Sequence, residues 1–114
     1  MAFQADLEHP EDLEIFVANA ATTAFKPLSA LTLHFRRTFN VVVTSFLDAV
    51  QRCRVLTAGR PGRIVAVSSA GGRHALPQYA ATELSKIALE TLVRYVAAEY
   101  GPDSITCNAV MPGV

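Results

Sequence analysis

Apolar residues along this chain of 114 residues fall into three short runs and two long helical repeats. The short runs have the length of β-strands and show little alternation with polar residues: residues 13–18, 63–68 and 105–111. In residues 31–55 and 79–100, apolar side chains instead recur at steps of three and four, which predicts two amphipathic helices. The β-branched residues 41–44 have weak helix propensity, so tertiary packing must hold the first helix there.

Turn-forming residues mark the ends of the two predicted helices. Gly59, Pro61 and Gly62 follow the first helix, and Gly101 and Pro102 follow the second. The predicted order is therefore β-α-β-α-β. Nearly continuous apolar strands joined by long helices predict an α/β fold with a parallel β-sheet and right-handed crossovers.

Polar or turn residues come directly after each predicted strand. Asn19 follows the first strand, Ser69 follows the second, and Pro112 and Gly113 follow the third. The carboxyl ends of parallel strands meet at one edge of the sheet, and ligands of such sheets bind beyond that edge. The sequence therefore predicts that these residues gather at a ligand site.

Composition narrows the functional classes. The chain has 10 basic and 10 acidic residues and no basic run, so it lacks the electrostatic footprint of a nucleic-acid-binding protein. No apolar stretch reaches the roughly 18 residues of a membrane span, and the acidic N-terminus lacks the pattern of a signal peptide. Cys53 and Cys107 fit neither a zinc spacing nor a disulfide framework, which favours a cytoplasmic protein. The scattered histidines predict no metal site.

Tyr79 and Lys86 stand seven residues apart on the second predicted helix. Seven helical residues turn through about 700°, so both side chains are expected on one face, roughly 10 Å apart along the axis. Such a pair alone often arises by chance. A phenol and an ammonium near the hydroxyl of Ser69 are nevertheless suited to delivering a proton to a carbonyl or enolate oxygen. The combination predicts an oxidoreductase active site.

Four sequence blocks give the chain a resemblance to the short-chain dehydrogenase/reductase family over nearly its whole length. The block FVANAA, with Asn19 and Ala20, is similar to the family's strand block that walls the adenosine side of the cofactor. The block RRTFNVVV places Asn40 on the family's helix asparagine. The block GRIVAVSSAGG places Ser69 on its substrate-orienting serine.

The fourth block is the helix with Tyr79 and Lys86, which leads to Pro112 and Gly113, similar to the family's motif near the nicotinamide. In the common family pattern three residues separate the tyrosine from the lysine, whereas six separate them here. Thr82 stands at the usual tyrosine position. Six intervening residues resemble the divergent enoyl-acyl-carrier-protein reductases of the family, whereas the Pro-Gly ending is closer to its carbonyl-reducing members.

The resemblance implies an oxidoreductase that uses NADPH or NADH and most resembles enzymes reducing an enoyl thioester, with an acyl carrier as one candidate carrier of the substrate. A ketone or 3-oxoacyl reductase is the alternative within the family. By resemblance, Tyr79 stabilises or protonates the substrate oxygen, and Lys86 holds the nicotinamide ribose and favours the phenolate. Ser69 orients the substrate carbonyl, and Asn40 holds a water of the proton relay. The implied cofactor contacts are Asn19, Ala20, Lys86, Pro112 and Gly113.

No Gly-x-x-x-Gly-x-Gly motif, the turn that brings backbone amides to a cofactor pyrophosphate, occurs in the chain. In the family this motif lies at the first strand. Residues 1–114 are therefore expected to be the central part of one Rossmann-like domain. Two hypotheses follow: an oxidoreductase that needs the missing parts, or a truncated, non-catalytic copy that only self-associates. The family's use of the two long helices as a subunit interface implies a homo-oligomer in either case.

Overall fold

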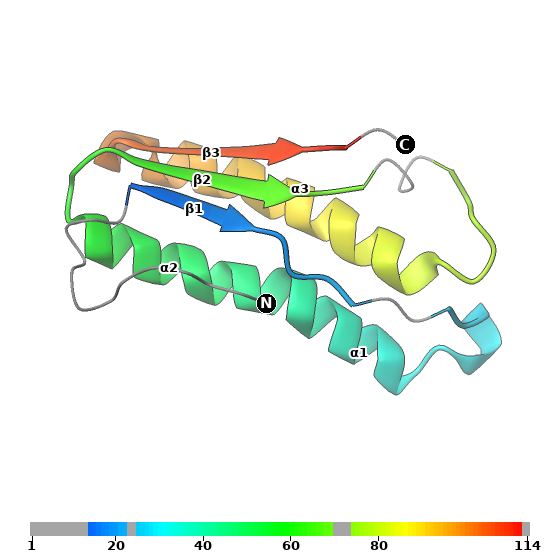
Figure 1. Cartoon of the computed structure of the whole chain (residues 1–114). Helices are drawn as coiled ribbons and strands as arrows, with labels where there is room; N and C mark the ends of the chain where they lie inside the picture. Colours follow the sequence, from blue (N-terminus) through cyan, green and yellow to red (C-terminus); the bar gives the residue numbers. More distant parts are fainter. Residues whose placement is uncertain (1–13, 23–24, 70–73, 113–114) are drawn as a thin grey trace.

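The computed structural model describes residues 14–22, 25–69 and 74–112. Within them, three strands form one parallel sheet in the order β1-β2-β3 (Figure 1). The strands are β1 (Ile15–Ala18), β2 (Gly62–Val67) and β3 (Ile105–Val110). The predicted parallel α/β fold is confirmed, and the strand positions agree with the apolar runs to within one or two residues at the described ends.

The first predicted helix consists of three consecutive pieces. These are α1 (Leu33–Phe39), a π-helical segment η3 (Asn40–Thr44) and α2 (Ser45–Thr57). The π-helical turns coincide with the β-branched run, where helix propensity is weakest. At the start of α2, the side-chain hydroxyl of Ser45 donates to the main-chain carbonyl of Val41 in η3, a polar contact that competes with regular helix bonding.

The second predicted helix is α3 (Ala80–Tyr100), which leads through the short 3₁₀ helix η5 (Gly101–Asp103) into β3. Ser104 has a φ of 65° and its amide donates to the carbonyl of Gly101 at 2.9 Å, which turns the chain into the strand. A short 3₁₀ helix (Leu28–Ala30, η2) precedes α1. Both crossovers thus run from a strand through a helix to the neighbouring parallel strand.

The hydrophobic core lies between the sheet and one layer of helices. The helices α2 and α3 cover the same face of the sheet (Figure 1). Side chains from every strand and from η3, α2 and α3 meet there: Phe16, Ile64, Cys107, Val42, Phe46, Val50, Leu89 and Val93. The residues of this core alternate along β1 with exposed ones, so Phe16 is 5% exposed while Ile15 is 58% exposed.

The opposite face of the sheet is not covered by a helix of the described residues (Figure 1). Ile15 and Val17 of β1 and Val110 of β3 are exposed there. Nearly continuous apolar strands are typical of parallel sheets that are buried on both faces, whereas the described residues bury only one face.

Candidate active site

The strand ends place the predicted ligand residues at one edge of the sheet. Asn19 follows β1, Ser69 lies two residues beyond β2, and Pro112 lies two residues beyond β3. Because all three strands are parallel, these positions share the carboxyl edge. Asn19 and Pro112 are exposed, and Ala20 and Ser69 are half-buried. Gly113 lies outside the described residues.

Lys86 is drawn into the fold at this edge. Its side chain is 6% exposed, and its Nζ donates a hydrogen bond of 2.8 Å to the main-chain carbonyl of Val67. That carbonyl belongs to the last residue of β2, two residues before Ser69. Lys86 and Ser69 therefore both lie near the end of β2.

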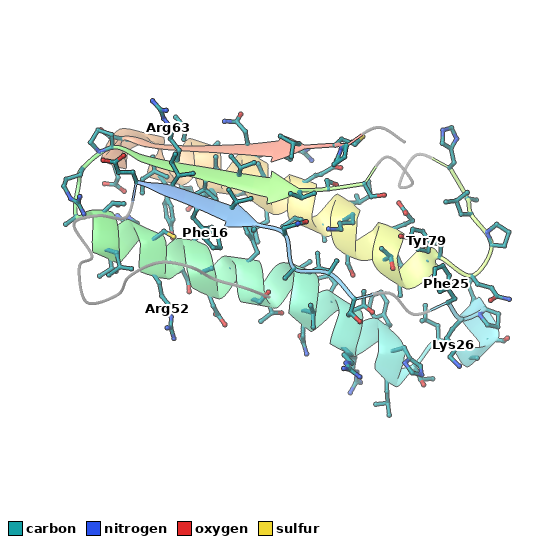
Figure 2. All side chains as sticks on the ribbon, viewed as in Figure 1. Phe16, Phe25, Lys26, Arg52, Arg63 and Tyr79 are labelled. Carbon is teal, nitrogen blue, oxygen red and sulfur yellow. The ribbon has the colours of Figure 1, made fainter. Side chains whose placement is uncertain are left out.

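Tyr79 is the N-cap of α3 and lies outside its helical repeat. Pro77 and Gln78, the latter with a φ of 62°, turn the chain, so that the Tyr79 carbonyl accepts the first helical bond from the Glu83 amide at 3.1 Å. The Tyr79 ring stacks on Phe25 with 5.5 Å between ring centroids (Figure 2). The helix therefore begins one residue later than predicted, and Tyr79 caps it instead of forming its first residue.

No hydrogen bond joins the Tyr79 hydroxyl to Lys86 within the described part of the chain. The segment that carries Phe25 is held beside the start of α3, because the Lys26 amide donates to the Gln78 carbonyl at 3.2 Å (Figure 2). The phenol thus lies at the amino end of α3, and the ammonium lies near the end of β2.

Asn40 begins the π-helical segment and its side chain is exposed. Its side-chain oxygen accepts a hydrogen bond of 3.1 Å from the Thr44 hydroxyl. Its main-chain carbonyl accepts the amide of Ser45, which is the longer bond of a π turn. Both oxygens of Asn40 therefore have protein partners, and the side-chain NH2 group remains a donor for a water.

Three polar residues at the same edge escaped the sequence analysis. Ser68, 5% exposed, donates from its hydroxyl to Glu90 Oε1 at 2.5 Å. Both carboxylate oxygens of Glu83 are shielded from solvent. Glu83, Lys86 and Glu90 are spaced by three and four residues, which places them on neighbouring turns along one side of α3. That spacing was the available signal for a charged cluster.

Burial sets the electrostatics of this cluster. Desolvation raises the pKa of Glu83, with a further increase from the charge of Glu90, while Lys86 acts in the opposite direction. Desolvation lowers the pKa of Lys86, and the charge of Glu83 opposes that change. The cluster is therefore a place where charged groups are partly removed from water and depend on one another.

The cysteines are not part of this chemistry. Burial raises the pKa of both Cys53 and Cys107 to about 11, so both remain thiols near neutral pH. The described residues hold no group of three or more metal-ligating side chains that could bind an ion. In the same part of the chain, no helix is both long and apolar enough to cross a bilayer.

The donor set at the carboxyl edge suits a ligand that carries hydroxyl groups. The Lys86 ammonium donates one N–H to the Val67 carbonyl. Its other two N–H groups have no acceptor among the described residues and can donate to a ligand. The side chains of Asn19 and Ser69 add amide and hydroxyl groups at neighbouring strand ends. This chemistry fits the nicotinamide-ribose half of a dinucleotide.

Known proteins match most of this chain, and a family model matches all of it. A family model described as enoyl-(acyl carrier protein) reductase matches residues 1–114. A 1-cyclohexenylcarbonyl-CoA reductase from Streptomyces collinus is 41% identical over 104 residues, which cover 90% of this chain and 36% of that protein. The hydroxynaphthalene reductase-like protein Arp2 from Metarhizium anisopliae is 37% identical over 114 residues, covering 97% of this chain and 42% of that protein. The chain thus spans about two-fifths of the length of these relatives.

Solved structures share the arrangement of the elements. A 4-hydroxyisoleucine dehydrogenase complexed with NADH and succinate superposes with a TM-score of 0.83 and 27% identity, covering 89% of this chain and 49% of that one. An acetoin dehydrogenase from Enterobacter cloacae superposes with a TM-score of 0.82 and 30% identity, covering 90% of this chain and 42% of that one.

Proposed function

The chain belongs to the short-chain dehydrogenase/reductase family, and from that membership we propose that it forms the central, catalytic part of a Rossmann-like NAD(P)H-dependent oxidoreductase. The observation that carries the proposal is the position of Lys86. Lys86 is 6% exposed, and its ammonium donates to the carbonyl at the end of a parallel strand. Burying a charged group costs free energy, so such a position points to a functional role. It lies at the edge where such sheets bind nucleotides.

A nicotinamide cofactor is supported by the family and by the residues present. NADH is bound in the 4-hydroxyisoleucine dehydrogenase, and NAD+ is bound in a xylitol dehydrogenase of similar fold. In this chain Lys86 would donate to the ribose hydroxyls, while Asn19, Ala20 and Pro112 would line the adjacent surface, together with Gly113. When bound, the reduced nicotinamide supplies a hydride to the substrate.

The chain's own residues would manage the oxygen of the substrate. Ser69 would orient the substrate carbonyl by a hydrogen bond, and the Tyr79 hydroxyl would donate to the oxygen on which negative charge develops. For this the substrate must reach from the end of β2 to the start of α3. Asn40 would hold a water that restores the proton to Tyr79, donating to it from its side-chain NH2 group.

An enoyl thioester is the favoured substrate. The six residues between Tyr79 and Lys86 support this choice. So does the likeness to a reductase whose name describes a CoA thioester with a carbon–carbon double bond beside its carbonyl. A ketone or 3-oxoacyl substrate is the second candidate, supported by the likeness to hydroxynaphthalene reductase-like proteins and an acetoin dehydrogenase. The acyl group would be carried on CoA or on an acyl carrier protein.

Self-association is the non-catalytic alternative, and it is also compatible with activity. Exposed apolar side chains on the outer surfaces of α2 and α3 would supply a subunit interface between copies of the chain, in the cytoplasm: Leu47, Val55, Leu84, Ile87 and Tyr95. A chain that has lost activity would keep this surface and lose any affinity for the cofactor.

Fluorescence titration of NADH and NADPH into the purified chain tests the proposed function. We expect saturable binding that is weakened by Lys86→Ala and retained by Tyr79→Phe, because the lysine contacts the ribose and the tyrosine contacts the substrate. Arg52→Ala, which removes an exposed cation on α2, is the control for charge loss. No binding at millimolar cofactor by a folded chain, as shown by circular dichroism, would favour the non-catalytic alternative.

A further inference from the structure

Glu83 lies one turn before Lys86 on α3, and its carboxylate is in an unusual position. Both of its oxygens are shielded from solvent, and neither has a hydrogen-bond partner among the residues that the structure describes. Glu90, two turns after Glu83, has a different environment, because the Ser68 hydroxyl donates to its Oε1. Two carboxylates on one helix thus flank the buried ammonium of Lys86. Of the two, Glu90 accepts a hydrogen bond from Ser68, and Glu83 accepts none from the described residues.

A shielded carboxylate without a partner is costly, since an anion removed from water needs a counter-charge or a hydrogen-bond donor. The charged groups that act on Glu83 are Glu90, which is unfavourable, and Lys86, which is favourable. Among the described residues, Glu83 is the charged residue that acts on Lys86. The charge of Lys86 therefore offsets part of the cost of burying Glu83.

Among the described residues, the elements packed against α3 bring no second buried cation, and Lys26, beside the start of the helix, is exposed. On α1, which packs against α3, His34, Arg36 and Arg37 are all exposed. On β3 the buried Cys107 remains a thiol, and on η5 Asp103 accepts from Arg54 at 2.8 Å.

We propose that Glu83 is a positioning residue whose carboxylate is the counter-charge of Lys86, keeping the amine an ammonium that donates both to the Val67 carbonyl and to a hydroxyl-bearing nucleotide. The nucleotide part of this inference rests on the proposed function, and the counter-charge part does not. A neutral amine would keep two N–H donors instead of three and would lose its charge-assisted bonds to the ligand. Glu83 would thus act on the ligand through Lys86 without touching it.

The two lysines of the chain make a direct test possible. In protein labelled with ¹³C at the lysine ε-carbons, the titrations of Lys86 and of the exposed Lys26 can be followed separately by NMR. We expect Glu83→Gln to lower the pKa of Lys86 and to leave that of Lys26 in place, because the amide keeps the shape and removes the charge. Glu99→Gln, an exposed change on the same helix, is the matched control and should move neither.

An unchanged or raised pKa of Lys86 in folded Glu83→Gln protein would overturn the inference. Should that variant not fold, Glu83→Asp serves instead, since it keeps the charge and withdraws it by one methylene. It should lower the pKa of Lys86 in the same direction, and no change would again overturn the inference.

A parallel NADH titration separates this inference from the proposed function. With Glu83→Gln, binding at neutral pH should weaken by about tenfold, the equivalent of one weakened charge-assisted hydrogen bond. A lowered pKa of Lys86 without any NADH binding by wild-type protein would contradict the proposed function and leave the counter-charge intact. Unchanged NADH binding by Glu83→Gln would contradict the positioning role.

Discussion

The two halves of α3 both carry buried residues, and they differ in which residues they bury. In the amino-terminal half the buried residues include Thr82, Ser85 and Lys86, at 2%, 0% and 6% exposure. In the carboxyl-terminal half they are Leu89, Val93 and Val96, at 2%, 5% and 5%. The buried residues of the two halves are exposed to a similar extent, so the degree of burial does not explain why one half is polar and the other apolar. The polar half lies toward the carboxyl ends of the strands, and the apolar half lies toward their amino ends (Figure 1).

This difference separates a packing surface from a reactive one. The apolar half contributes to stability through removal of its side chains from water. The polar half must satisfy its groups locally: the Ser85 hydroxyl donates to the Ala81 carbonyl at 2.8 Å, and Lys86 donates to Val67. The Thr82 hydroxyl has no partner among the described residues. Such polar burial contributes little to stability, and its position at the ligand edge points to chemistry.

The largest expected effect is on the apolar half. Leu89→Ala should lower the free energy of unfolding by about 3 kcal/mol, because it removes a buried side chain and leaves a cavity. Urea unfolding followed by circular dichroism measures the change. Leu84→Ala, on the same helix but 52% exposed, should stay within about 0.5 kcal/mol of wild type. Equal losses in both variants would contradict the assignment of the core.

The polar, amino-terminal half of α3 should affect ligand binding more than stability. Lys86→Met leaves the Val67 carbonyl without its donor and the Glu83 carboxylate without its counter-charge, so the free energy of unfolding should fall by about 1 to 3 kcal/mol. NADH binding should weaken between about tenfold and a hundredfold, since charge-assisted hydrogen bonds are lost. Unchanged NADH binding by folded Lys86→Met protein would make Lys86 a structural residue.

Ser68→Ala tests the link between β2 and α3. It removes the hydroxyl that donates to Glu90, so we expect a loss of about 1 kcal/mol in the free energy of unfolding. Denaturant unfolding at constant pH measures it. Glu90→Gln keeps an acceptor oxygen and should lose less than Ser68→Ala. A larger loss from Glu90→Gln would show that the charge of Glu90, and not the hydrogen bond, holds the two elements together.

The smallest expected effect is a pH dependence of stability. The pKa of Glu83 is raised in the folded chain by desolvation and by Glu90, so the folded state keeps a proton that the unfolded state releases. The free energy of unfolding should therefore fall as the pH rises from the ordinary value of 4.5 through the raised value of the folded state. Thermal unfolding across this window should show the fall in wild type and less of it in Glu83→Gln. A rise in wild-type stability specific to Glu83 would contradict the direction.

The order of strands and helices could be predicted because periodicity records which residues face the sheet. The break in the first helix was less accessible, since the β-branched residues 41–44 indicate weak propensity but not a π-helical turn. The offset of Tyr79 follows from the turn at Pro77 and Gln78, whose positive φ is a property of the folded loop. Glu83 and Glu90 were visible as spacing, but the bond between Glu90 and Ser68 depends on tertiary packing, which the spacing does not show.

The uncovered face of the sheet shows a second feature that the sequence pattern could not predict. The apolar pattern of Ile15 and Val17 records that these residues suit burial, and it does not say what covers them. The chain spans about two-fifths of the length of its relatives. Among the described residues, no helix covers the face of the sheet that carries these apolar side chains.

The most direct test of the central claim, that the polar half of α3 is part of a nicotinamide site, is a ¹H-¹⁵N NMR titration of the isotope-labelled chain with NADH. We expect the amide resonances of Asn19, Ser69 and Lys86 at the carboxyl edge to shift together and to saturate with one affinity. Amides at the opposite ends of the strands, such as those of Arg63 and Thr106, should remain in place. Saturable shifts centred on Arg63 and Thr106, or none at all in a folded chain, would contradict the claim.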